Sequence, residues 1–90
     1  MQNNLGDYLS KSILSNADKK LLKAFGSRVR QIREKKNQTV YDLTGDDMPI
    51  KSRQHWQQIE NGQKNINITT VFKIAKSLGV QAEDLLKSLP

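Results

Sequence analysis

The stretch SRQHWQQIENG, residues 52–62, contains one short helix together with its start and stop signals. Ser52 is a residue type that caps helix N-termini, and Asn61-Gly62 is typical of a helix end. Trp56 and Ile59 lie three positions apart, so they face the same side of a helix. The stretch therefore predicts a helix over about 52–60 with an apolar inner face and a polar outer face.

The outer face of this helix carries an arginine and three glutamines. These are Arg53, Gln54, Gln57 and Gln58. Arginine forms paired hydrogen bonds with guanine and glutamine with adenine in the DNA major groove, and each pair contributes about 1–3 kcal/mol of discrimination. A glutamine-rich face can also be simply a soluble surface. Three such side chains on one face are hard to explain as a packing face, and we favour base reading.

Length and composition indicate the class of protein. Ninety residues suffice for one small domain. The chain has no cysteine, which excludes disulfides and thiolate metal sites and fits an intracellular protein. We expect a cytoplasmic protein without a membrane span, because no apolar run approaches about 20 residues and residues 1–7 lack the pattern of a secretory signal.

The charge balance favours an anionic partner. Fifteen Lys and Arg against nine Asp and Glu give a net charge of +6, with a pI near 9.8. Phosphate backbones attract such a surface, although many small basic proteins bind no nucleic acid. Charge is therefore supporting evidence only.

Helical periodicity continues on both sides of the opening stretch. The clearest amphipathic helix is predicted to begin after Asn16 as N-cap and to run to about Lys36, with Gly26 weakening it slightly. Thr39 is predicted to cap a short helix over about 40–44, and residues 45–51 form a loop. A fourth helix is expected from Ile68 or Thr69 to the glycine at 79, and a fifth over 81–89.

These helices predict an all-α fold of four to five helices, since no segment alternates apolar and polar residues as a strand would. The expected core is Leu22, Phe25, Val29, Ile32, Leu43, Trp56, Ile59, Val71, Ile74, Ala75, Leu78 and Leu85. Leu86 and Leu89 are also expected to pack inward. Residues 16–90 form the domain, and residues 1–15 are either a weakly ordered arm or an extra short helix that packs on a partner.

Two short helices separated by a turn, the second with an amide-rich face, form the helix-turn-helix arrangement. The segments FGSRVRQIREKK (25–36), IENGQKNI (59–66) and VFKIAKSLGV (71–80) resemble the Xre-type (phage repressor/Cro-like) helix-turn-helix family. The resemblance covers residues 22–88. It implies a compact phage-repressor-like DNA-binding domain whose recognition helix precedes the Glu-Asn-Gly turn.

The resemblance also assigns roles to individual positions. The residues matching base-reading positions are Ser52, Arg53, Gln54, Gln57 and Gln58. The residues matching phosphate-binding positions are Thr39, Lys51, Asn61, Lys64 and Asn65. Arg33 and Glu60 match a structural ion pair between the first helix and the end of the third.

Three features depart from the family pattern. Val40 stands where the family usually has a phosphate-contacting glutamine, and Thr44 stands where it favours alanine. The loop over 45–51 is about two residues longer than usual. The family pattern therefore predicts the identity of the recognition helix better than the angle at which this helix meets DNA.

The expected function is a sequence-specific regulator of transcription that binds double-stranded DNA, most simply a small repressor. A homodimer is expected, because one short helix contacts few base pairs and dimers of this class read two half-sites. The alternative is an antitoxin or another protein-interaction module, with a toxin or other protein as its partner, which the 15-residue arm motivates. RNA binding is a third interpretation, and the exposed aromatic residues that single-strand recognition prefers are not expected in this chain.

No arrangement of residues indicates an enzyme, a cofactor site or a metal site. A nucleophile with its base, a glycine-rich phosphate loop and a supported acid pair are all missing from the sequence. The single histidine, His55, is expected at the surface or against a phosphate, and Trp56 in the core.

Overall fold

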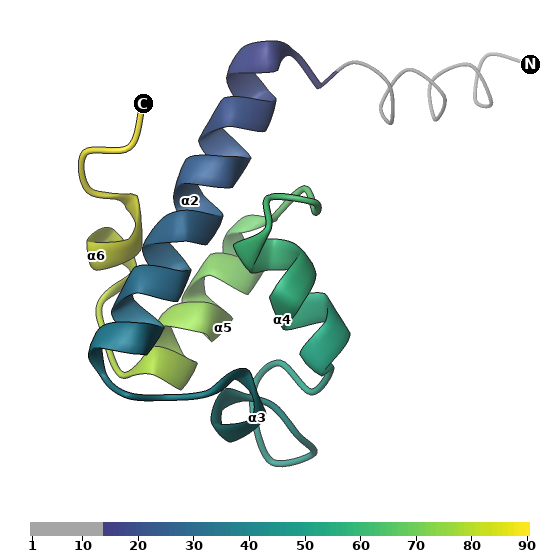
Figure 1. Cartoon of the computed structure of the whole chain (residues 1–90), viewed down its shortest axis with the longest axis vertical. Coiled ribbons are helices and arrows are strands. Elements are labelled where there is room, and N and C mark those ends of the chain that lie inside the picture. Colours follow the sequence, from purple (N-terminus) through teal and green to yellow (C-terminus); the bar gives the residue numbers. More distant parts are fainter. Residues whose placement is uncertain (1–13) are drawn as a thin grey trace, which may run out of the picture.

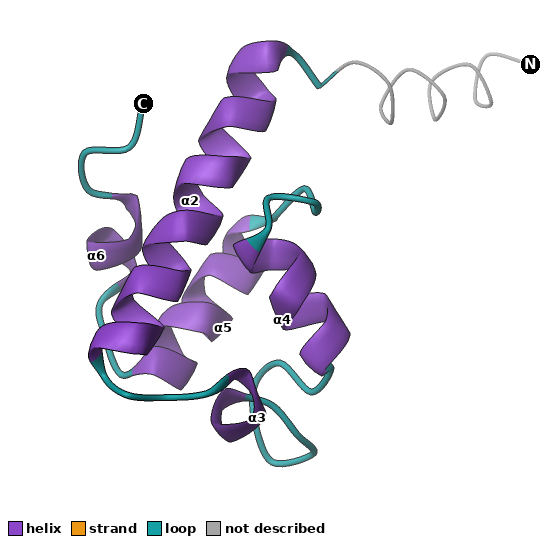
Figure 2. Cartoon of the chain, in the orientation of Figure 1, coloured by secondary structure: helices purple, strands orange, loops and turns teal. Residues whose placement is uncertain are grey.

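The protein is an all-helical domain in the computed structural model, which describes residues 14–90 (Figures 1 and 2). The described chain forms α2 (Asn16–Lys35), α3 (Val40–Leu43), α4 (Arg53–Glu60), α5 (Ile68–Leu78) and α6 (Ala82–Leu86). No strand occurs in this part of the chain, as the sequence predicts. The predictions for the N-terminal arm, including the partner that it would contact, concern mainly residues 1–13 and lie outside the described residues.

The N-cap of α2 lies one residue before the cap predicted from the sequence, so the helix begins at Asn16 itself. Its N-cap is Ser15, whose hydroxyl accepts a hydrogen bond from the Asp18 backbone N–H at 3.0 Å. The Asp18 carboxylate in turn accepts from the Ser15 backbone N–H at 3.1 Å. The prediction of Asn16 was wrong because a cap at 15 places an acidic residue three positions on, where a reciprocal capping box can close.

Helix α3 has the predicted cap at Thr39, whose side chain forms the same kind of reciprocal box with Asp42. The helix ends at Leu43, one residue before the predicted end, because the backbone of Thr44 is extended. The Thr44 side chain is nearly buried, and its hydroxyl donates to the Val40 carbonyl at 2.8 Å. That hydrogen bond explains how a threonine is tolerated at a position where the family favours alanine.

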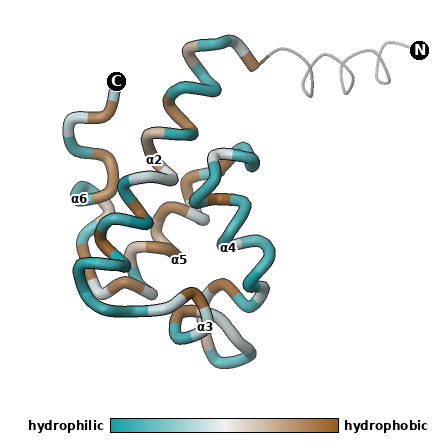
Figure 3. The backbone as a smooth tube through the Cα atoms, viewed as in Figure 1, coloured by the Kyte–Doolittle hydropathy of each residue, from teal (hydrophilic) through white to brown (hydrophobic). Residues whose placement is uncertain are grey.

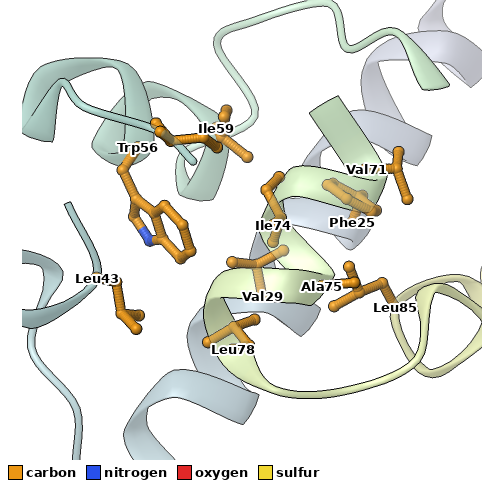
Figure 4. Close-up of a cluster of buried hydrophobic side chains, with 11 residues drawn as sticks. Phe25, Val29, Leu43, Trp56, Ile59, Val71, Ile74, Ala75, Leu78 and Leu85 are labelled. Atoms are coloured by element: carbon orange, nitrogen blue, oxygen red, sulfur yellow. The ribbon is translucent and has the colours of Figure 1, made fainter. Parts of the chain in front are cut away.

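The core gathers around Trp56 and the inner face of α5 (Figure 4). Ten of the predicted core residues are buried, and Trp56, Val29, Ile59, Ile74 and Leu85 are fully so. Two predictions were wrong in degree, since Leu22 and Ile32 are only partly buried. The structure adds Ile50, which is 4% exposed: the loop over 45–51 contributes this side chain to the core cluster.

The C-terminal helix is shorter than the sequence predicts. The αL glycine at Gly79 ends α5, and its backbone N–H bonds to carbonyls of the last turn. Helix α6 then stops at Leu86, because Lys87 is extended and Ser88 has a positive φ of 60°. Leu86 is 44% exposed, so the prediction that it packs inward was wrong.

The arrangement leaves α4 at one side of the molecule (Figure 1). Helix α2 contacts α4, α5 and α6, and α3 packs against α4. Arg28 ties α2 to α6 by donating to the Asp84 carbonyl at 2.9 Å. The backbone of α4 is mostly hydrophilic in Figure 3, whereas α5 is largely hydrophobic. Among the described helices, none is long and apolar enough to span a membrane.

Candidate nucleic-acid interface

The N-terminal end of α4 presents the side chains that the sequence selects as base readers. Ser52 is the N-cap, and its hydroxyl accepts from the His55 backbone N–H at 3.1 Å. Arg53, Gln54 and Gln57 are exposed, and Gln58 is partly buried. Because their side chains lie outside the core, they are available to a partner that approaches α4 from solvent.

These side chains, with the exception of Gln57, border two separate hollows. The first hollow, about 350 Å³, is mostly polar; its lining is Ser52, Gln54, His55, Gln58 and Lys64. The second, about 310 Å³, is also mainly polar; its lining is Tyr41, Thr44, Gly45, Lys51 and Arg53. Two glutamines that lie one helical turn apart thus share a surface with a lysine, and the arginine lies apart from them beside α3.

Most residues predicted to bind phosphate lie near the two ends of α4. Asn61, Lys64 and Asn65 are exposed in the turn that follows the helix, and Lys51 is exposed just before it. Thr39 stands apart from both groups because its hydroxyl caps α3. Val40, where the family usually has glutamine, is partly buried and packs against the core.

The C-terminal end of α4 is fixed by the carboxylate of Glu60. Arg33 donates to both carboxylate oxygens, with Nε 2.7 Å from Oε2 and Nη2 3.1 Å from Oε1. The indole Nε1 of Trp56 donates to Oε2 at 2.7 Å. Only 2% of the Glu60 side chain is exposed. The two residues that the sequence pairs are therefore in direct contact, and a buried indole completes the site.

This environment changes the acidity of both partners. Burial raises the pKa of Glu60, but the hydrogen bonds from Arg33, Trp56 and Arg30 outweigh it, and the pKa ends below its ordinary value. The hydrogen bond to Glu60 raises the pKa of Arg33. Glu60 is thus held as a carboxylate inside the protein, which is the opposite of what a general acid would need.

Sequence reasoning missed Arg30, one turn before Arg33 on α2. Its Nε lies 3.3 Å from Glu60 Oε1, and its Nη2 donates to Asn61 Oδ1 at 2.7 Å. The second contact engages the oxygen of the Asn61 amide, so the amide N–H groups are the part left for another partner. The spacing of three between Arg30 and Arg33 puts both on one helix face, but this spacing alone does not show that Arg30 reaches Glu60.

Two glycines allow α2 to approach the end of α4 closely. A Cβ on Gly26 would collide with the backbone carbonyl oxygens of Ile59 and Glu60. A Cβ on Gly62 would lie 2.8 Å from the Lys23 Cα, and Gly62 has a φ of +72°. Gly26, which helix propensity treats as a weakness of α2, is therefore required by the contact between the two helices.

Tyr41 was also missed by sequence reasoning. It lies on α3 and is 70% exposed, and Phe72 on α5 is 59% exposed, so the expectation that the chain lacks exposed aromatic residues was wrong. The centre of its ring is 5.0 Å from the guanidinium carbon of Arg53. An aromatic residue on the short helix therefore contacts one of the predicted base readers.

Comparisons with known proteins identify the family of this chain. Residues 29–85 match the model of a protein family described as Helix-turn-helix. Control protein C.BamHI of Bacillus amyloliquefaciens is 37% identical over 62 residues, which are 69% of this chain and 75% of that protein.

Solved structures show the same fold. The restriction-modification controller protein C.AhdI from Aeromonas hydrophila superposes with a TM-score of 0.64 and 26% identity, over 71% of this chain and 94% of that chain. The clp gene regulator ClgR from C. glutamicum superposes with a TM-score of 0.66 over 73% of this chain and 83% of that chain; at 24% identity, this match bears on the fold alone.

Proposed function

The chain belongs to the Xre-type helix-turn-helix family of DNA-binding transcriptional regulators, and from this premise we propose that α4 enters the major groove and reads the sequence of its operator. The observation that carries the proposal is the division of α4 into two faces. Trp56, Ile59 and Glu60 are buried against α2 and the core. The side chains at the start of the helix face solvent and are of the types that pair with base edges.

The base readers in this proposal are Ser52, Arg53, Gln54, Gln57 and Gln58. Gln54 and Gln58 border one hollow, so they would meet neighbouring base pairs from the same side of the helix. Arg53 borders the other hollow and would meet a guanine displaced along the groove. Each good pair of hydrogen bonds would supply about 1–3 kcal/mol of discrimination.

The phosphate contacts in this proposal are Thr39, Lys51, Asn61, Lys64 and Asn65. The contact from Arg30 to the Asn61 oxygen supports the role of Asn61, because it leaves the amide N–H groups to donate to a phosphate. Lys51 and Lys64 carry positive charge to the two hollows beside α4. These contacts would fix the register of the helix without reading the sequence.

We further propose a homodimeric, non-enzymatic repressor that acts in the cytoplasm, where its DNA would lie. Residues 16–90 would be the DNA-binding unit. A reading helix of eight residues covers few base pairs, and two copies reading half-sites about 34–36 Å apart would supply the rest of the specificity. Large apolar side chains that a second copy could cover are available on α5, where Ile68 is 63% and Phe72 59% exposed.

The decisive experiment is selection of bound duplexes from a random pool, followed by titration at two salt concentrations. A palindromic consensus bound by two chains is expected. Binding that is lost at moderate salt and yields no consensus would contradict sequence-specific reading.

Individual roles are tested by a matched pair of variants on one hollow. Gln54→Ala should relax the preference at one or two positions of the consensus. Lys64→Ala should weaken binding to all sequences alike and lower the salt slope by about one. Gln63→Ala, an exposed amide in the turn after α4, is the control. An unchanged consensus with Gln54→Ala would remove that residue from the set of readers.

A further inference from the structure

The exposed tyrosine of α3 is large, aromatic and outside the core. Trp56 and Phe25 are buried and pack in the core, whereas 70% of Tyr41 is exposed. Its ring centre lies 5.0 Å from the Arg53 guanidinium carbon, within the distance at which an arginine is attracted to an aromatic face. Tyr41 and Arg53 also line one hollow, together with Lys51.

Both sides of this contact are attached to well-fixed backbone. Tyr41 lies between Thr39 and Asp42, which close the capping box of α3, and the same short helix is anchored in the core by Leu43, which is 1% exposed. Arg53 is the first residue of α4, directly after the Ser52 cap. The backbone on both sides of the contact is therefore held by capping hydrogen bonds.

The charges in the hollow favour the same arrangement. Lys51 lies in it as a second cation and would repel a freely moving Arg53. The carboxylate of Asp42, next to Tyr41, is already engaged by the Thr39 backbone N–H at 2.9 Å. Among the described residues, Arg53 forms no ion pair. The face of the ring is thus the attractive surface that the structure offers to its guanidinium.

We propose that Tyr41 is a positioning residue for sequence reading, which stacks on the Arg53 guanidinium and holds its N–H groups in the orientation that meets a guanine. The inference rests on the proposed function of α4. Stacking occupies the face of the guanidinium and leaves its in-plane donors free, so the same group can stack and form paired hydrogen bonds. Holding one rotamer in advance reduces the entropy lost when the base is bound.

The ring, not the hydroxyl, carries this role. A tyrosine near DNA could instead donate its hydroxyl directly to a phosphate. Phenylalanine keeps the aromatic face and removes only the hydroxyl, so Tyr41→Phe should retain the stacking. Tyr41→Ala removes both. The comparison of these two variants therefore separates positioning from a direct phosphate contact.

The binding experiment uses the full chain, the selected duplex and a duplex in which the base pair assigned to Arg53 is changed. Tyr41→Ala should lower the preference between these duplexes about two- to fivefold, the range expected of an exposed cation–π contact. Tyr41→Phe should keep the preference. In an Arg53→Ala background, Tyr41→Ala should have no further effect. A loss with Tyr41→Phe equal to that with Tyr41→Ala, or an equal loss on both duplexes, would overturn the proposal.

A second measurement needs no DNA. The NMR signals of the Arg53 Nε–H and Cδ–H₂ groups should show the ring-current shift of Tyr41 in the free protein. The shift should persist in Tyr41→Phe and disappear in Tyr41→Ala. If duplex selection gave no consensus while this shift was present, the function of α4 would fail and the stacking would stand. An operator consensus without the shift, or an Arg53→Ala variant with unchanged preference, would overturn the positioning role alone.

Discussion

The two ends of α4 are held in different ways. At the C-terminal end, Glu60 accepts hydrogen bonds from Arg33, Arg30 and Trp56, and only 2% of its side chain is exposed. At the N-terminal end, one hydroxyl cap at Ser52 and one stacking contact at Arg53 lie at the surface. The buried end determines where the helix is, and the exposed end keeps side chains available to bind. A reading helix needs both properties at once.

The largest effect should come from Arg33→Ala. It leaves the Glu60 carboxylate buried without its bidentate partner, and breaking a buried pair from one side costs about 3–5 kcal/mol. Urea unfolding should show a loss of this size in the free energy of unfolding. Lys20→Ala, an exposed position on the same helix, should change it by less than about 0.5 kcal/mol. A loss as small as that of the lysine variant would mean that the ion pair does not hold α4.

Gly26→Ala tests the close approach of α2 to the same end of α4. Helix propensity alone would make alanine more stable by about 1 kcal/mol. We expect instead a loss of about 1–3 kcal/mol, because the added methyl group would overlap the carbonyl oxygens of Ile59 and Glu60. The change in the free energy of unfolding shows whether the variant is stabilised or destabilised. Ser27→Ala is the matched control on an exposed position of α2, and a stabilised Gly26→Ala would contradict the contact.

Ser52→Ala tests the exposed end. Removing an N-cap hydroxyl costs about 1 kcal/mol, so the free energy of unfolding should fall modestly. Faster hydrogen exchange at the His55 amide, which the hydroxyl accepts from, should accompany the loss. Asn67→Ala, which removes the cap of α5, should cost a similar amount without changing that amide. Equal exchange at His55 in both variants would show that the Ser52 hydroxyl does not specifically protect this amide.

The last effect is a pH dependence of the free energy of unfolding, which appears only in acid. The folded pKa of Glu60 lies below the value of about 4.3 for an unfolded glutamate. Its stabilisation is therefore complete above about pH 4.3 and is lost as the pH falls through the lower folded pKa. The urea concentration at the unfolding midpoint, measured between pH 2 and 7, should fall as the solution becomes acidic. Glu60→Gln should make this fall smaller.

Asp42 sharpens the acid experiment. The Thr39 backbone N–H lowers the pKa of this carboxyl in the same direction, but the group is exposed. Asp42→Asn should therefore remove a smaller part of the acid slope than Glu60→Gln does. If Asp42→Asn removed more of the acid slope than Glu60→Gln, the acid sensitivity would come from the cap of α3 and not from the hydrogen bonds to Glu60.

Predictions based on local signals were mostly successful. The caps at Thr39 and Ser52, the αL glycine at 79 and the buried pair of Trp56 and Ile59 are readable because each depends on a few neighbouring residues. The errors at Asn16 and at the end of α6 concern helix boundaries, which the Ser15 capping box and the backbone of Lys87 and Ser88 decide, and the error at Leu86 concerns burial. The family pattern added the Arg33–Glu60 pair, whose atoms the structure brings to 2.7 Å.

The sequence by itself determined the helices, their inward faces and the amide-rich start of α4, because periodicity and capping are properties of neighbouring residues. Only the tertiary structure decided that Gly26 is a contact, that Arg30 joins the Glu60 site, that Ile50 enters the core and that Tyr41 lies over Arg53. Each of these pairs segments far apart along the chain or across a loop. Their proximity follows from how the helices pack, which no local pattern encodes.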